Sequence, residues 1–198
     1  MHSYRKHFTL FTTLLFALST PLILAAQETA AATTYRWDIT SVISQNGVNT
    51  ISAGGVDYAL AADLTSIQVR GHGTFGGGAA PTGGGSWIIS NSAGAPISSG
   101  TFTVTALVQF VPASGALAPA AVDKIGNKAD ARSGLAVLRI RYSDGSSGTL
   151  TISCHLPVGS PGVIFEGTTA TKGFAGFWNR VPPVPGVNAN RTIFHVLR

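Results

Sequence analysis

The sequence predicts an all-β fold, and within it a single antiparallel β-barrel of about eight strands in an up-and-down meander. Three observations support this prediction: 24 glycines, only 11% charged residues, and short apolar runs rich in Val, Ile, Phe, Trp and Thr. Runs of this kind, bounded by Gly, Ser, Asn and Pro, are typical of strands joined by tight turns. No segment shows a convincing helical pattern. A two-sheet β-sandwich is the less favoured alternative.

Residues 1–26 are predicted to be a secretory signal peptide. Basic residues that include Arg5 and Lys6 precede an apolar stretch from Phe8 to about Leu24, and two alanines follow it. This order of basic, apolar and small residues directs secretion and ends in cleavage. An uncleaved membrane anchor is the alternative. It is disfavoured because Pro21 and several hydroxyl residues interrupt the stretch.

Residues 27–34 are expected to be a disordered linker, and residues 35–198 a single β-barrel or β-sandwich domain. The mature protein is then expected to be secreted, either extracellular or periplasmic. A chain of this length can bury a core of its own. Because Cys154 is the only cysteine, no intramolecular disulfide can form, and packing and sheet hydrogen bonds must provide the stability.

The charge distribution argues against a nucleic-acid partner. Without Arg5 and Lys6 the formal net charge of +5 falls to about +3, and the basic residues are scattered instead of forming a run. No membrane partner is expected after cleavage, because no later segment is long and apolar enough to span a bilayer. A small molecule or a glycan remains as the expected ligand. No cofactor is expected, and the oligomeric state is left open.

A weak repeat marks several predicted strand starts, where small and hydroxyl residues precede a large apolar one. Three of these large residues, Phe75, Trp87 and Phe102, lie 12 and 15 positions apart. This spacing is typical of successive strands in an antiparallel meander. The clearest single strand is predicted over Thr101–Val111, where strict alternation assigns one apolar face to Phe102, Val104, Ala106, Val108 and Phe110.

A hairpin is predicted from Gly134–Tyr142 and Ser146–Leu156. A two-residue loop would mix the polar and apolar faces of the two strands. A three-residue loop with Gly145 in the left-handed conformation aligns the faces instead. The expected pairs are then Leu138 with Leu150 and Ala136 with Ile152.

The last strand, Arg191–Leu197, carries apolar residues on both faces and is therefore expected to be paired and covered. Pairing it with the first strand, Tyr35–Ile43, would close the sheet and remove two exposed edges. This closure is the reason for preferring a barrel to a sandwich. Two long connections remain, over Pro112–Ser133 and Val181–Asn190.

Aromatic residues beside flexible glycines are the candidate ligand contacts. Aromatic faces flanked by Asn and Lys suit sugar rings or flat apolar molecules. The candidates are Trp87, Phe174 and Trp178, with His72 as a polar anchor. The alternative for Phe174 and Trp178 is a segment that caps one end of the core.

His155, Glu166 and Arg139 are the weak catalytic candidates. In a barrel, the polar face that carries His155 and Arg139 could line the lumen, although an ordinary solvated outer face is favoured. Cys154 and His155 cannot form a nucleophile and base pair, because successive side chains leave a strand on opposite faces. Cys154 is instead expected to be a buried, inert thiol.

No metal site is predicted, because no two histidines or carboxylates have ligand-like spacing.

Charge gathers only between Asp123 and Arg132, where five charged residues lie within ten positions. A solvated loop tied by weak local ion pairs is the favoured interpretation of this cluster, and a lid or ligand clamp is the alternative.

These observations together predict an exported β-domain that binds a small apolar ligand or a carbohydrate. One alternative is an isomerase, cyclase or lyase of barrel form, in which a lumen histidine moves a proton. The other alternative is a structural or surface-interaction protein without a pocket. The sequence does not decide whether the protein is an enzyme.

Overall fold

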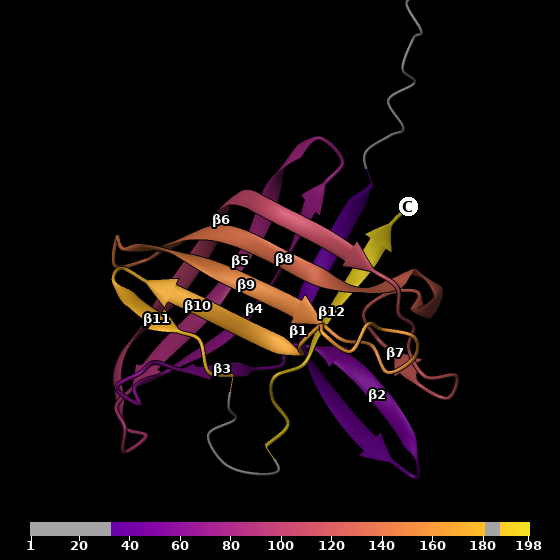
Figure 1. Cartoon of the computed structure of the whole chain (residues 1–198), viewed down its shortest axis with the longest axis horizontal. Helices are drawn as coiled ribbons and strands as arrows, with labels where there is room; N and C mark the ends of the chain where they lie inside the picture. Colours follow the sequence, from indigo (N-terminus) through magenta and orange to yellow (C-terminus); the bar gives the residue numbers. More distant parts are fainter. Residues whose placement is uncertain (1–32, 181–186) are drawn as a thin grey trace, which may run out of the picture. The chain divides into compact units, whose positions relative to one another are not determined.

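The computed structural model describes residues 33–180 and 187–198, which form an all-β unit of twelve strands and one short 3-10 helix (Figure 1). The all-β class predicted from the sequence is confirmed. The elements, in chain order, are β1 (Thr34–Gln45), β2 (Val48–Ala53), β3 (Asp57–Leu60), β4 (Ser66–Gly76), β5 (Ala79–Ser90), β6 (Pro96–Ala113), β7 (Val122–Asp123), η1 (Lys128–Asp130), β8 (Ala131–Tyr142), β9 (Ser147–Cys154), β10 (Gly167–Lys172), β11 (Ala175–Phe177) and β12 (Thr192–Leu197).

The predicted signal peptide and most of the predicted linker lie outside the described residues. Thr34, the last residue of that linker, is the first residue of β1. The part of the proline-rich connection over residues 181–186 also lies outside the described residues. In the part of the chain that the structure describes, no helix has the length and apolar character needed to cross a bilayer.

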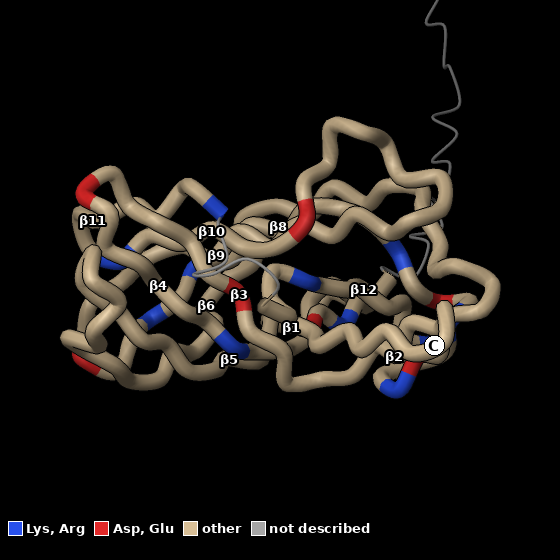
Figure 2. Tube along the Cα trace, turned by 90° about the horizontal axis from the view of Figure 1, so that it is seen from below, with Lys and Arg blue, Asp and Glu red and all other residues tan. Residues whose placement is uncertain are grey.

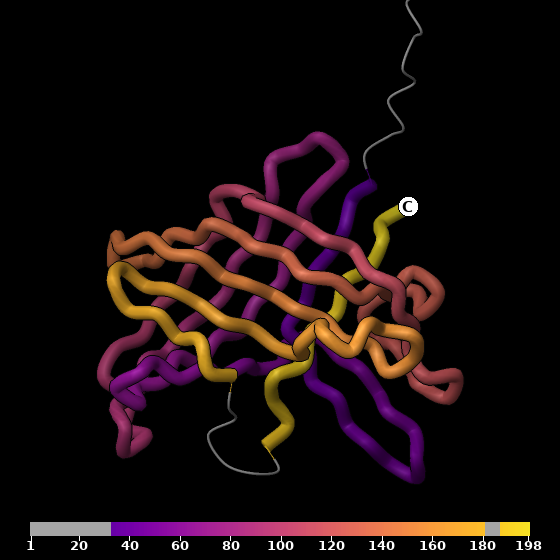
Figure 3. The backbone as a smooth tube through the Cα atoms, viewed as in Figure 1, coloured from indigo at the N-terminus to yellow at the C-terminus, as the bar shows by residue number. Residues whose placement is uncertain are grey.

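The strand β12 closes the sheet into a ring. Along the sheet, β1, β4, β5, β6 and β8 are successive neighbours, and β12 pairs with both β1 and β8 (Figure 1). The backbone trace shows the yellow C-terminal strand lying beside the indigo β1 (Figure 3). The expected pairing of the last strand with the first is therefore confirmed, with Trp37 opposite Phe194. The sheet has twelve strands instead of about eight, because β2, β3, β7 and β11 are short additions to the main path.

Large apolar side chains fill the interior of the ring. Trp37, Trp87 and Phe194 are almost fully buried there, and the Phe110 ring bridges Phe75 and Phe194 at centroid distances of 4.8 and 5.1 Å. Tilted and edge-on contacts of this kind add to the stabilisation that burial of aromatic area provides. The interior is thus a packed core, and the polar face of the strands looks outward.

Two irregularities in β6 overturn the strict alternation expected for this strand. The register with β8 shifts between Val104 and Ala106 and again between Leu107 and Gln109. The extra residues of these bulges are Thr105 and Val108. Val108 is consequently 54% exposed, while Leu107 packs against the core in its place. Each bulge adds one residue to the strand and so reverses the alternation that follows it. The second bulge cancels the effect of the first, and Phe110 packs against the core as predicted.

The hairpin of β8 and β9 has the predicted register. Leu138 lies opposite Leu150, and Ala136 lies opposite Ile152. Gly145 has a φ of 86°, and its backbone N–H donates to the carbonyl of Tyr142 at 3.0 Å. The three-residue loop thus places the apolar faces of both strands toward the core.

Candidate functional site

A cavity of about 380 Å³ lies between the β1–β2 hairpin, the segment that follows β6, the end of β9 and the start of β12. Aliphatic side chains form most of its wall, and polar groups lie at a few points. The lining residues are Thr40, Val42, Asn49, Ile51, Leu117, Ala118, Ala121, His155, Leu156, Pro157, Glu166, Arg191, Thr192 and Ile193. A mainly apolar wall with a few convergent polar groups is the usual character of a small-molecule site.

Glu166 and His155, two of the predicted catalytic candidates, meet at this cavity. The carboxylate oxygen Oε2 of Glu166 accepts a hydrogen bond from the backbone N–H of His155 at 2.5 Å. Its other oxygen, Oε1, accepts from the backbone N–H of Thr192 at 2.6 Å. Glu166, the residue just before β10, therefore connects the end of β9 to the start of β12.

Burial changes the acidity of Glu166. Removing the carboxylate from water raises its pKa from 4.5 to about 7, although the hydrogen bonds from Thr192 and His155 and the charge of Arg191 act in the opposite direction. A carboxyl group with a pKa near neutrality can exchange a proton at physiological pH. Such groups are frequent at functional sites, but buried structural networks contain them too.

The imidazole of His155 has a defined tautomer when it is neutral. Its Nδ1 lies 3.0 Å from the carbonyl oxygen of Ile164, and a carbonyl oxygen can only accept a hydrogen bond. Nδ1 therefore carries the proton, and Nε2 keeps its lone pair. No described residue donates to Nε2. The lone pair is thus free to accept a hydrogen bond from a molecule in the cavity.

A second buried carboxyl group, Asp57 on β3, supports the chain beside the cavity. Its Oδ1 accepts a hydrogen bond from the backbone N–H of Arg191 at 3.0 Å, and its Oδ2 has no partner among the described residues. Burial is the largest cause that raises the pKa of Asp57 well above its usual value, and the charge of Glu166 adds to the effect. Arg191 is in this way held at the cavity wall through its backbone.

The other predicted site residues lie elsewhere in the unit. Trp87 is buried in the core, where its indole N–H donates to the carbonyl of Thr101 at 3.1 Å. Phe174 is fully exposed at the turn between β10 and β11, and Trp178, which follows β11, is 62% exposed. His72 is an exposed residue of β4. None of these four residues lines the cavity.

Arg139, the third catalytic candidate, is also absent from the cavity wall. It lies on the exposed face of β8, opposite Thr149 of β9, and lines a separate surface groove. Only His155 and Glu166 of the predicted catalytic set are brought together. Cys154 is fully buried on the opposite face from His155, and burial raises the pKa of its thiol.

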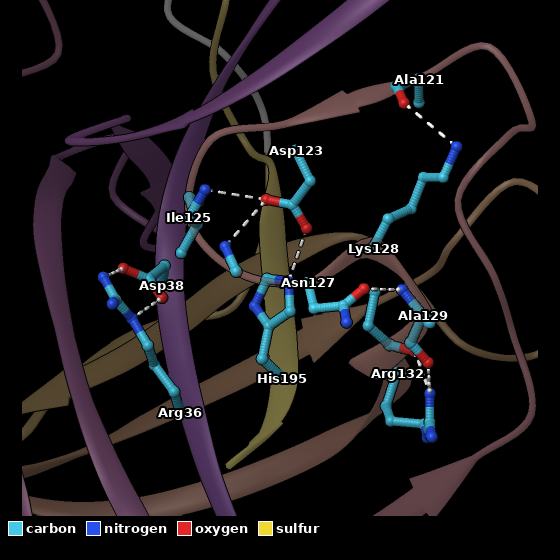
Figure 4. A network of polar contacts seen from close by, with 12 residues as sticks. Arg36, Asp38, Ala121, Asp123, Ile125, Asn127, Lys128, Ala129, Arg132 and His195 are labelled. Atoms are coloured by element: carbon cyan, nitrogen blue, oxygen red, sulfur yellow. Dashed lines mark hydrogen bonds and ion pairs between the residues drawn. The ribbon is translucent and has the colours of Figure 1, made fainter. Parts of the chain in front are cut away.

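In the charged segment from Asp123 to Arg132, Lys124 and Lys128 are exposed, as expected for a solvated loop, but the side chain of Asp123 is not. The Asp123 side chain is 1% exposed, and its Oδ2 lies 2.7 Å from Nε2 of His195, which is 2% exposed (Figure 4). Its Oδ1 accepts hydrogen bonds from the backbone N–H groups of Ile125 and Gly126. This segment therefore lies over β12 and contacts it through a buried polar pair. The alternation of residues in β12 does not predict this contact.

Sequence reasoning did not identify Arg191, Thr192 and Asp57 as part of this region. No short motif contains them, because β3 and β12 come together only in the folded unit. One signal was present in the sequence. The chain has eight acidic residues, and burial of a carboxyl group costs free energy, so a buried one needs a structural or functional reason. Acidic residues next to apolar runs, as in Phe165-Glu166 and Val56-Asp57, therefore indicate buried carboxyl groups.

Charged positions are sparse and scattered over the unit (Figure 2). Within residues 33–180 and 187–198, no group of three or more His, Cys, Asp or Glu side chains has a geometry that could hold a metal ion.

Comparisons with protein-family models, with curated proteins and with solved structures gave no significant match.

Proposed function

We propose that this protein is an exported domain that binds a small, mainly apolar molecule with one polar end in the cavity beside His155 and Glu166. The observation that carries the proposal is the composition of the cavity wall. Aliphatic side chains such as Val42, Ile51 and Leu117 surround a volume of about 380 Å³. Volumes of this size are common among ligand sites, whose walls are mostly apolar.

The polar groups at the wall favour a ligand with a hydroxyl or carboxyl group. His155 offers the lone pair of Nε2 as an acceptor, which suits a hydroxyl hydrogen. Arg191 also lines the cavity, and the N–H groups of its guanidinium other than the one that donates to the carbonyl of Asn190 suit a carboxylate oxygen. The apolar body of the ligand would replace water against the aliphatic side chains, and this burial would provide most of the affinity.

The test uses the fluorescent probe N-phenyl-1-naphthylamine, which emits strongly only in apolar surroundings. We expect saturable binding to the wild-type protein. Ala118→Phe, which places a ring in the cavity, should weaken binding about tenfold or more, since the ring occupies the space of the probe. Ala175→Phe on β11 is the matched control, because Ala175 is exposed and does not line the cavity.

Equal probe affinity in the wild type and in Ala118→Phe, with the folds of both proteins intact, would refute the proposed site. Native mass spectrometry of the protein purified from its own medium would complement the titration. A retained small molecule would identify the natural ligand class by its mass.

One observation favours an enzyme as the second candidate function. Glu166, with a pKa of about 7, lies beside a histidine with a free lone pair in a cavity, and this combination can move a proton on a bound substrate. The substitution His155→Gln separates the two functions. If the protein is an enzyme, this variant should lose turnover of the retained molecule while it keeps the affinity for the naphthylamine probe.

A further inference from the structure

The strands β5, β6, β8, β9 and β10 contain no aspartate or glutamate. Together they form a continuous part of the sheet, since each of them pairs with the next. Two arginines, Arg139 and Arg141, project from the exposed face of β8 at the centre of this region. This face of the sheet therefore carries positive charge with no carboxylate from its own strands to balance it.

Hydroxyl groups flank the two guanidinium groups on the neighbouring strands. Arg139 lies opposite Thr149 of β9, and Arg141 lies between Thr103 of β6 and Ser147 of β9. The row continues to β10, where Oγ1 of Thr171 is 3.1 Å from Oγ1 of Thr149.

A shallow groove of about 570 Å³ follows this row, and Thr105, Arg139, Arg141, Ser147, Thr149 and Thr171 contribute to its wall. The groove therefore combines two cationic donors with several neutral groups that can donate or accept hydrogen bonds.

Neither guanidinium group is neutralised within the described residues. No carboxylate there lies within ion-pair distance of Arg139 or Arg141, whereas Arg36, Lys172 and Arg198 each have an acidic partner. Two residues apart on one strand, the side chains of Arg139 and Arg141 start about 7 Å from each other on the same face. Two like charges at this distance repel, and anionic groups that bind between or over them would relieve the repulsion.

We propose that this groove binds an extended acidic polysaccharide whose sugar rings carry carboxylate groups. Each guanidinium group can hold a carboxylate through two parallel hydrogen bonds, and the threonine and serine hydroxyl groups suit the hydroxyl groups of the sugar. No aromatic side chain lines the groove, so it lacks the stacking surface that single-stranded nucleic acids use. The groove shares no residue with the cavity beside Glu166, and this proposal is therefore independent of the proposed function.

Binding of the full-length mature protein to polygalacturonate, measured by biolayer interferometry, tests this proposal. We expect the wild type to bind and the affinity to fall as sodium chloride is added, because salt screens the charges. The double variant Arg139→Gln, Arg141→Gln should lose about tenfold or more in affinity, since both charge-assisted contacts are removed. The double variant Lys124→Gln, Arg198→Gln removes the same charge from residues outside the groove and should keep the affinity.

Three results would overturn the proposal. The first is an absence of binding to polygalacturonate, and the second is equal binding by the Arg139→Gln, Arg141→Gln variant whose thermal unfolding matches that of the wild type. The third is binding of a single-stranded oligonucleotide as tight as that of polygalacturonate, which would indicate a general attraction to polyanions. Weak binding of uncharged dextran beside strong binding of polygalacturonate would support the assignment of the carboxylate as the recognised group.

Discussion

The carboxylate of Glu166 accepts a hydrogen bond from the backbone N–H of His155 at 2.5 Å. The carboxyl group whose pKa is raised by burial at the cavity therefore also fixes the position of the neighbouring histidine. The same carboxylate accepts the N–H of Thr192. The protonation state of Glu166 and the geometry of the cavity are consequently coupled. A change in the charge of Glu166 alters the contact between the end of β9 and the start of β12.

Glu166 should make the stability of the fold depend on pH. Its pKa is about 7 in the folded state and 4.5 as an ordinary value, so the folded protein binds more protons than the unfolded chain between these values. The free energy of unfolding should then fall as the pH rises from about 4.5 to 7, by up to roughly 3 kcal/mol. Asp57 contributes with the same sign, since burial also raises its pKa.

The substitution Glu166→Gln isolates this contribution. Glutamine keeps one acceptor oxygen and cannot ionise, so the loss of stability with rising pH should be smaller in the variant. Its amide nitrogen faces a backbone N–H group, and the lost hydrogen bond should cost about 1 kcal/mol at every pH. Urea unfolding between pH 5 and pH 8 measures both effects. If the free energy of unfolding depends on pH in the same way for the wild type and the variant, Glu166 does not titrate in this range.

Asp123→Ala should destabilise the segment over residues 114–130. The substitution leaves the buried His195 without its partner and removes the acceptor of the Ile125 and Gly126 N–H groups. A loss of roughly 2–4 kcal/mol is expected, because a broken buried pair leaves unsatisfied polar groups. Urea unfolding gives the magnitude. Trypsin should also cleave the variant faster after Lys124 and Lys128.

The control for this experiment is Asp63→Ala. Asp63 also accepts hydrogen bonds in a turn, from the backbone and hydroxyl of Thr65, but it is solvent-exposed. The unfolding midpoint of this control should change far less. If both variants unfold at the same midpoint, the Asp123–His195 contact contributes little to the stability.

Cys154 should be unreactive in the folded protein. It is fully buried, and burial is the largest of the causes that raise the pKa of the thiol, so little thiolate exists at pH 8. Ellman's reagent should therefore release almost no colour from the native protein within minutes. In concentrated guanidinium chloride the same sample should react with one thiol per chain. Rapid reaction of the native protein would show that β9 opens readily.

The sequence predicted those features of the fold that follow from local alternation and turn chemistry. The Leu138–Leu150 register is an example, because Gly145 and two alternating faces leave one consistent loop length. The closure by the last strand was also predictable, since its apolar residues on both faces require pairing. The bulges in β6 were not, because Thr105 and Val108 have ordinary strand residues on either side and no glycine or proline marks them.

The candidate site was predicted only in part for a related reason. His155 and Glu166 were singled out by their chemistry, but their meeting depends on the path of the chain between β9 and β10. Arg191, which precedes β12, lines the same cavity, and Asp57 of β3, far away in the sequence, holds its backbone by a hydrogen bond. The buried contact of Asp123 with His195 depends on a loop folding over β12, which no periodicity encodes.

Gly145→Val tests the turn on which the register of β8 and β9 depends. No atom outside its immediate neighbours lies within 4 Å of a Cβ added at Gly145, so any cost must come from its φ of 86°. A β-branched residue in the left-handed region is strained by about 1–2 kcal/mol. Urea unfolding should show this loss. Gly162→Val is the matched control, since a side chain there also enters open space but needs no left-handed backbone.

A larger effect is expected if the strained turn changes the pairing of the strands. Contacts between Leu138 and Leu150, measured by NMR as cross-strand nuclear Overhauser effects, would then disappear together with the stability. If the contacts persist while the stability falls, valine strains the turn without moving the register. If Gly145→Val unfolds at the same urea concentration as Gly162→Val and the wild type, the left-handed conformation of Gly145 does not determine this hairpin.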